Sequence, residues 1–223
     1  MEARKLLLGA ILLLGLCLAA NPSAAIVVTS LPGGTVYAMP AVNYFGPGPQ
    51  SFGPGIVWTS TNATNNGGSV FGFTTLYSFG MPLNGDWDGA LGPMAGLNDS
   101  FLDYGVTDTM TFTLPRPVKG VGGFMNYAPP TTVPIPTTIA VYDSTHTLIE
   151  SYNLTFLTSG ANDTGEFLGF LESSPIIKYF TLTDNFIGIT DLTTVPSVPL
   201  PGAVWLLGSG LAGLLGLRRF RKQ

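Results

Sequence analysis

The sequence predicts an all-β protein built as an antiparallel β-sandwich, and three observations support this fold class. Residues 26–192 are rich in Gly, Pro, Thr, Ser and Asn, a composition that favours strands and turns over helices. Short apolar runs follow one another at regular spacing and are separated by turn residues, as in sandwich folds. No part of this stretch shows the hydrophobic period of an amphipathic helix.

The first half of this stretch contains three apolar runs that predict strands, at Ile26–Val28, Ile56–Thr59 and Val70–Phe79. Residues 46–55 hold three prolines and four glycines, which interrupt a hydrogen-bonded ladder, so we expect no regular structure there. Residues 62–69 are polar and predict a loop. Residues 80–105 are the most acidic and the least regular part of the domain.

The clearest strand in the chain is Thr109–Leu114, where threonines alternate with apolar residues over the whole run. The Pro-Arg-Pro segment at 115–117 is expected to end this strand, because proline cannot donate a hydrogen bond to a β-ladder. Residues 118–127 are apolar and rich in glycine, which predicts a strand that crosses a packed core.

The last third of the domain predicts a hairpin and three more strands. Residues 137–143 and 148–157 flank the short polar segment Ser144–Thr147, so we expect them to pair through a turn. Three apolar runs follow, at Phe167–Leu171, Ile176–Thr183 and Asn185–Leu192. We therefore place the sandwich domain at residues 26–192 and a short Thr/Pro/Ser linker at residues 193–198.

The first 25 residues have the parts of a secretory signal peptide. Arg4 and Lys5 precede an apolar core at residues 6–20. Small side chains at Ser23 and Ala25 predict cleavage after Ala25. The sequence therefore predicts that the domain is exported.

The charge of the domain limits its partners. Between Ile26 and Ser197 there are three basic and twelve acidic residues, which gives a formal charge of 3 − 12 = −9. Such a surface repels a phosphate backbone, so we expect no nucleic-acid partner, whereas cations and neutral glycans are compatible with it. His146 is the only histidine and lies in the expected hairpin turn, which argues against zinc enzymes and against Ser-His or Cys-His catalysis.

A short acidic segment is a candidate metal site. Asn84, Asp86 and Asp88 place oxygen ligands at alternating positions before Gly89, like the first half of a calcium-binding loop. The twelfth position is Ala95, so the glutamate that closes an EF-hand loop is missing. Other carboxylates would have to complete a different kind of site, namely Asp99, Asp103 or Asp191. The sequence thus predicts Ca²⁺ as a candidate cofactor, and an Asx-rich turn without metal is the alternative.

Two tryptophans of the domain are candidates for sugar binding. Trp87 lies between two of these aspartates, and an aromatic face beside polar groups suits stacking on a sugar ring. Trp58 offers the same ring chemistry, and for both a packing role is the alternative. The loop aspartates could also supply the carboxylate pair of a glycoside hydrolase, but their turn-like settings favour a protein without catalytic residues.

The C-terminal segment contains a proline motif, an uncharged apolar run and a basic cluster, in that order. The motif consists of Val198, Pro199, Leu200 and Pro201. The uncharged run at 199–217 is 19 residues long, near the lower limit of about 17–25 for a transmembrane helix. Residues 218–223 follow with four cations that the positive-inside rule keeps in the cytoplasm, Arg218, Arg219, Arg221 and Lys222.

This tail resembles the PEP-CTERM protein-sorting signal of Gram-negative bacteria. It is similar to the Val-Pro-Leu-Pro subclass, in which a leucine stands where Leu200 does, and which continues with a run like Trp205–Leu211. The resemblance implies cleavage at the motif by an exosortase, a membrane-embedded cysteine transpeptidase. The strand pattern of residues 108–192 also resembles exported PEP-CTERM proteins with a jelly-roll or galactose-binding-like sandwich, which would make this sandwich jelly-roll-like.

These observations predict an exported protein of the cell surface or extracellular matrix. Its precursor would be held in the inner membrane by the tail, and the mature protein would bind exopolysaccharide without catalysing a reaction. Two alternatives remain open. One is a surface glycan hydrolase that uses the loop aspartates, and the other is a permanently anchored periplasmic domain.

Overall fold

The computed structural model describes residues 26–61, 69–72, 78–80, 86–88, 92–98, 108–127, 136–157, 165–184 and 186–196, and for residues 78–80, 86–88 and 98 it describes only the backbone. The expected signal peptide at 1–25 and the sorting signal at 199–223, with its transmembrane helix, lie outside these residues. Within the described part every secondary-structure element is a β-strand and every strand pairing is antiparallel, which confirms the all-β prediction. No helix there is long and apolar enough to cross a membrane.

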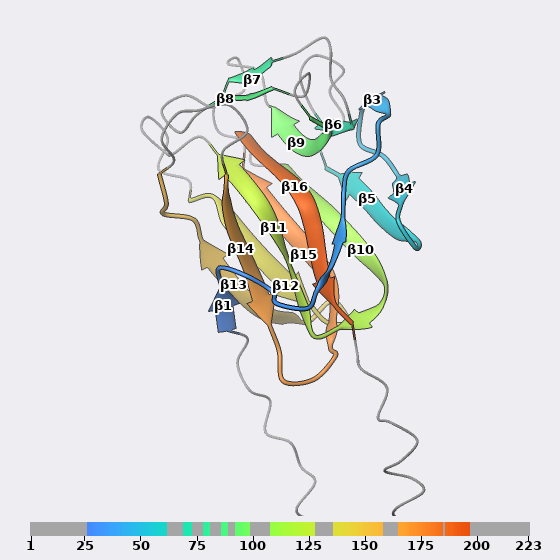
Figure 1. Ribbon diagram of the computed structural model, residues 1–223, viewed down its shortest axis with the longest axis vertical. Helices are drawn as coiled ribbons and strands as arrows, with labels where there is room; N and C mark the ends of the chain where they lie inside the picture. Colours follow the sequence, from blue (N-terminus) through green and yellow to red (C-terminus); the bar gives the residue numbers. More distant parts are fainter. Residues whose placement is uncertain are drawn as a thin grey trace, which may run out of the picture.

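The first sheet contains eight of the described strands, in the order β1-β14-β11-β16-β9-β6-β3, with β2 paired to β16. Its strands are β1 (Ile26–Val28), β2 (Thr35–Tyr37), β3 (Asn43–Phe45), β6 (Ser69–Gly72), β9 (Met94–Asn98), β11 (Gly120–Tyr127), β14 (Glu166–Leu171) and β16 (Phe186–Val195). The chain between β1 and β2 runs across the outer face of this sheet (Figure 1). Leu31 on this crossing segment is buried over Gly120, where an added Cβ would lie only 2.9 Å from the leucine side chain.

The second sheet contains six of the described strands, in the order β13-β12-β15-β10-β5-β4. Its strands are β4 (Gln50–Phe52), β5 (Ile56–Ser60), β10 (Asp108–Val118), β12 (Thr138–Tyr142), β13 (Leu148–Asn153) and β15 (Ile177–Asp184). This sheet lies behind the first in Figure 1. Strands β12 and β13 pair with each other, which confirms the expected hairpin. A separate two-stranded sheet, β7 (Ser78–Gly80) with β8 (Asp86–Asp88), lies above the upper end of the sandwich.

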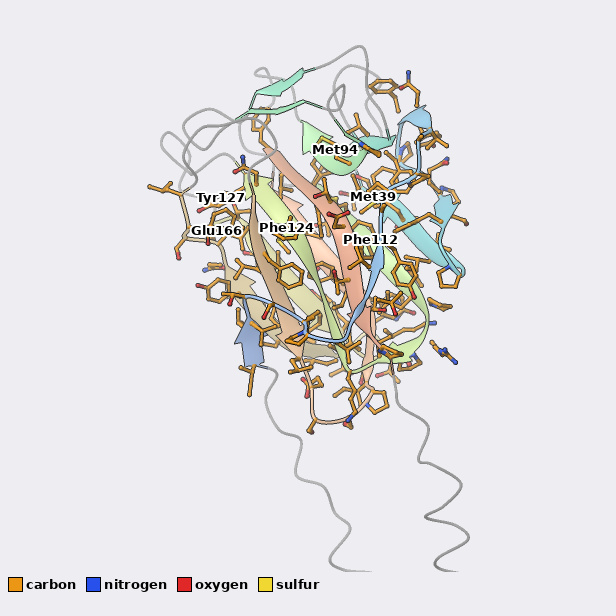
Figure 2. All side chains as sticks on the ribbon, in the orientation of Figure 1. Met39, Met94, Phe112, Phe124, Tyr127 and Glu166 are labelled. Carbon is orange, nitrogen blue, oxygen red and sulfur yellow. The ribbon has the colours of Figure 1, made fainter. Side chains whose placement is uncertain are left out.

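The hydrophobic core lies between the two large sheets and is built from both of them. On β10, the side chains of Met110, Phe112 and Leu114 are at most 1 % exposed, and the threonines between them are half-buried (Figure 2). The ring of Phe112 stacks on Phe180 of β15, with 6.3 Å between the ring centroids. Phe170 of the first sheet meets Phe180 edge-on at 6.4 Å, so these aromatic rings join the two sheets. The alternation read from the sequence thus separates core from surface on this strand.

Two strands lie where the sequence predicted none, and for residues 46–55 the expectation of no regular structure is wrong. Strand β4 falls inside the proline-rich segment 46–55. It is short and forms an edge of the second sheet. An edge strand has a neighbour on one side only, so the missing N–H groups of nearby prolines remove few hydrogen bonds from the ladder. Strand β9 falls inside the irregular segment 80–105, yet it is buried and pairs with both β6 and β16. Its sequence has no β-branched or aromatic residue, so strand propensity gives no signal there.

Strand β10 continues through the Pro-Arg-Pro segment to Val118, so the prediction that this segment ends the strand is wrong. The register between β10 and β15 shifts between Thr113 and Val118, which marks a bulge. Lys178 of β15 donates hydrogen bonds from its Nζ to the carbonyl oxygens of Leu114 and Pro115. These contacts satisfy the carbonyl groups that the bulge leaves without a partner in the ladder.

Strand β16 extends to Val195, three residues beyond the expected end at Leu192. The prediction that residues 193–198 form a linker is therefore wrong for residues 193–195. These residues pair with β11 on one side and with β2 on the other. Strand β2 was not predicted, and together with β11 it holds the end of β16 in the sheet.

Candidate functional site

The segment expected to bind calcium or a sugar lies in the small β7–β8 sheet. The backbone of Asp86–Asp88 forms β8, in a register that pairs Gly80 with Asp86 and Ser78 with Asp88. The expected loop conformation is therefore wrong for these three residues. Asn84 lies outside the described residues, so calcium binding and sugar stacking by Trp87 stay predictions. Among the described side chains, no group of three or more His, Cys, Asp or Glu is placed to hold a metal ion.

Trp58 belongs to the core and does not offer a surface for a sugar. Its side chain is 0 % exposed on β5. Its ring stacks on Phe71 with 5.2 Å between centroids, and Tyr44 meets it edge-on at 6.5 Å. The packing role is thus confirmed for Trp58, and it joins the two sheets because Phe71 belongs to the first sheet.

The outer face of the second sheet carries a regular array of hydroxyl groups. Because Met110 and Phe112 point into the core, the alternating residues of β10 point outward. The strand registers place other hydroxyl residues beside them in three rows across the sheet: Thr138–Thr183–Thr109–Thr61, Thr181–Thr111–Thr59 and Tyr142–Tyr179–Thr113. We call these residues the hydroxyl face. Thr61 is exposed and the other members are half-buried, as expected for side chains packed beside one another on an open sheet.

Some hydroxyl groups of this face bond to each other and others are free to bind a ligand. The Oγ1 atoms of Thr109 and Thr183 lie 2.8 Å apart and share a hydrogen bond. The hydroxyl groups of Thr59, Thr111 and Thr113 have no hydrogen-bond partner in the described part of the chain. The centre of the face therefore presents donors and acceptors that only solvent or a ligand can satisfy.

The lower row of the hydroxyl face ends in aromatic rings. The ring of His146 stacks on that of Tyr179, with 4.1 Å between centroids and 22° between the ring planes. Tyr142 lies directly beside Tyr179 in the register of β12 and β15. His146 is exposed at the hairpin turn with a φ of 62°, which confirms the prediction of a turn residue. The face thus combines aliphatic and aromatic surface with hydroxyl groups, and none of its three rows contains a charged residue.

Glu172 is a buried carboxyl group in the connection after β14. Its side chain is 4 % exposed, and neither carboxylate oxygen has a hydrogen-bond partner in the described residues. Burial raises the pKa of Glu172 above its ordinary value of 4.5, and the negative charge of Glu150 raises it further. The backbone N–H of Ser173 points toward the carboxyl group and lowers this pKa in part, without reaching hydrogen-bond geometry. Glu172 is held in place through its backbone, whose N–H donates to the carbonyl oxygen of Lys119 at 2.7 Å.

A hollow of about 300 Å³ opens at the lower end of the sandwich. It lies between β2, the bulge of β10 and the end of β16, and Tyr37, Arg116 and Pro196 are among the residues that line it. Arg116 is exposed there.

Comparisons with protein-family models, with curated proteins and with solved structures found no match for this chain. The function is therefore argued from the residues described above. Sequence reasoning missed both the hydroxyl face and the buried Glu172. The repeated Thr-x-Thr pattern at 59–61, 109–113 and 181–183 was a signal for the face, but only the strand register shows that the three segments lie side by side.

Proposed function

We propose that the protein is an exported, non-catalytic protein of the cell surface or extracellular matrix, sorted by its C-terminal tail. Residues 1–25 direct export, and a transmembrane helix at 199–217 holds the precursor in the inner membrane with residues 218–223 in the cytoplasm. An exosortase-type enzyme cuts at Val198–Pro201. The sandwich, of jelly-roll or galactose-binding-like type, then binds exopolysaccharide outside the cell. The order of proline motif, uncharged run and basic cluster in the tail carries this proposal.

The position of the two ends of the described chain supports it. Ile26 is the register partner of Leu171, which also pairs with Gly120. Gly120 in turn pairs with Val195. The first strand therefore begins, and the last strand ends, in one row at the lower end of the first sheet (Figure 1). A body tethered there by a tail would direct its upper end away from the membrane and would leave both sheet faces accessible from the side.

The basic residues of the body also gather at this lower end. Residues 26–197 contain only Arg116, Lys119 and Lys178 as basic residues. The backbone N–H of Lys119 donates to the carbonyl oxygen of Val195 at 2.9 Å, so Lys119 lies where the last strand ends. Arg116 lies in the β10 bulge beside it, and Lys178 of β15 bonds to the carbonyl groups of this bulge. In an acidic protein, this asymmetry favours an orientation with the lower end toward a negatively charged membrane surface.

Mass spectrometry of the mature protein from the surface fraction tests the sorting proposal. We expect a C-terminus at or near Val198–Pro201 and no peptide from residues 218–223. The variant with Pro199→Ala and Pro201→Ala should accumulate as uncut precursor, whereas Pro196→Ala, just outside the motif, should be processed normally. An intact tail in the surface fraction would contradict processing and would identify a permanently anchored domain.

The non-catalytic assignment has a separate test. The purified protein is incubated with soluble and insoluble polysaccharides, and the release of reducing sugars is measured. We expect no release above the level of a buffer control. Release that disappears on Asp86→Asn or Asp88→Asn would overturn the assignment in favour of a glycan hydrolase.

A further inference from the structure

We propose that the hydroxyl face binds the surface of an uncharged, ordered polysaccharide, in which parallel sugar chains present repeated hydroxyl groups. This inference rests on the proposed function, because it names the ligand class and the face for glycan binding by the exported sandwich. Its test uses purified protein and does not depend on whether the tail is processed.

The geometry of the face matches a flat, repetitive ligand. Neighbouring strands lie about 4.8 Å apart, and outward residues on one strand repeat about every 6.8 Å. The rows of threonines across β12, β15, β10 and β5 therefore form a two-dimensional lattice with a hydroxyl and a methyl group at most positions. Each hydroxyl can donate and accept, as a sugar hydroxyl does, and each methyl can contact the C–H groups of a sugar ring.

The charge of the face selects the class of polymer. No charged side chain stands in any of the three rows, so an acidic polysaccharide would find no cation there. The body around the face is acidic, with twelve acidic and three basic residues between 26 and 197. It would repel a polyanion at any distance shorter than the screening length. An uncharged polymer avoids both costs.

The aromatic end of the face adds the second element of sugar recognition. The stacked pair of His146 and Tyr179 and the neighbouring Tyr142 place rings at the end of the lower row. The exposed ring of His146 can contact the apolar side of a sugar, while the hydroxyl groups of Thr111 and Thr113, which have no partner in the described residues, bond to its polar edge. Rings and free hydroxyl groups are thus neighbours on one open surface.

The test is a binding assay with the full chain in detergent micelles. Retention is measured on microcrystalline cellulose and on an insoluble β-1,3-glucan, with an alginate gel as the anionic polymer. The decisive variant replaces Thr59, Thr111 and Thr113 by Val, which keeps the β-branched shape and removes only hydroxyl groups that have no partner in the described residues. Thr190→Val is the matched control, because Thr190 is half-buried on the outer face of the other sheet.

We expect the wild type and the Thr190→Val control to bind at least one neutral polymer and not alginate. The triple variant should bind it about tenfold more weakly, as expected for losing one or two hydrogen bonds. Circular dichroism and the melting temperature confirm that the variant is folded. Equal binding by the triple variant and the control, equal binding to alginate, or no binding of the wild type to either neutral polymer would each overturn the proposal. Inhibition of ice recrystallisation by the wild type without polysaccharide binding would also overturn it, in favour of an ice surface.

Discussion

The buried carboxyl group of Glu172 allows a sharp test of the structure through Glu172→Gln. Glutamine has nearly the same shape as glutamate but cannot ionise. The wild-type carboxylate is 4 % exposed and has no hydrogen-bond partner in the described residues, so its charged form is destabilised in the folded protein. A buried polar group without a partner costs about 1–3 kcal/mol, and a charged group costs more. Glutamine leaves a neutral amide in the same place, so the substitution removes only the additional cost of the charge. We therefore expect Glu172→Gln to stabilise the fold at pH 7.5 by about 1–2 kcal/mol.

The dependence on pH follows from the raised pKa of Glu172. Burial, and then the charge of Glu150, raise this pKa above 4.5 in the folded state. Between 4.5 and the raised value, the folded state binds more protons than the unfolded state, so stability falls as the pH rises through this window. Below the window the side chain is neutral in both states. The difference between wild type and Glu172→Gln should thus be near zero at pH 4 and should reach its full size above the window.

Thermal unfolding monitored by circular dichroism between pH 4 and pH 8 measures this difference. For a domain of this size, about 1–2 kcal/mol corresponds to an increase in melting temperature of about 3–6 °C. Glu150→Gln should give a smaller gain in the same pH range, because it removes only the repulsion. Glu166→Gln is the control, since Glu166 is exposed on β14. If Glu172→Gln lowers the melting temperature at pH 7.5, or raises it equally at pH 4, the argument from burial is refuted.

Three further predictions test the fold and the metal site. Gly72 has a φ of 95° and leaves no room for a Cβ beside a backbone carbonyl of the segment before β3, so Gly72→Ala should lose at least about 2 kcal/mol in urea unfolding. Gly92→Ala, whose Cβ meets no atom of the described residues within 4 Å, should lose less than about 0.5 kcal/mol, and equal losses would contradict the backbone path. Phe112→Ala should lower the free energy of unfolding by about 3–5 kcal/mol in the same assay. Phe124 is 44 % exposed on the first sheet (Figure 2), so Phe124→Ala should lower it by less than about 1.5 kcal/mol, and the reverse order would refute the assignment of the core. If the segment around β8 binds calcium, adding Ca²⁺ after chelation should raise the melting temperature of the wild type. This increase should disappear when both β8 aspartates are replaced by Asn, and an unchanged melting temperature of the wild type would count against the site.

The sequence by itself determined the fold class, because alternation and turn residues are local signals. The Thr109–Leu114 alternation predicted which side chains of β10 enter the core, and the polar segment at 144–147 predicted the β12–β13 hairpin. The tail of proline motif, apolar run and cations is also a local signal, because a membrane segment is recognised by composition and length, and it stays a prediction.

Other strands could not be read from the sequence because their stability comes from distant partners. Strand β9 has little strand propensity, yet β6 and β16 on its two sides hold it in the first sheet. Strand β10 crosses two prolines because Lys178, more than sixty residues away, bonds to the carbonyl groups that the bulge exposes. Local propensity is a weak guide wherever tertiary hydrogen bonds replace those that the sequence removes.

The candidate site shows the same division. The threonines at alternate positions were visible in the sequence, and they fixed only which residues share a side of each strand. The order of strands and their register, decided by packing of the two sheets around Phe112 and Phe180, brought Thr59, Thr111 and Thr181 into one row. The tertiary structure also buries Glu172 without a hydrogen-bond partner in the described residues. Local sequence set the alternation because it follows from the pleat of a single strand, whereas neighbourhood across strands depends on contacts between residues far apart in the chain.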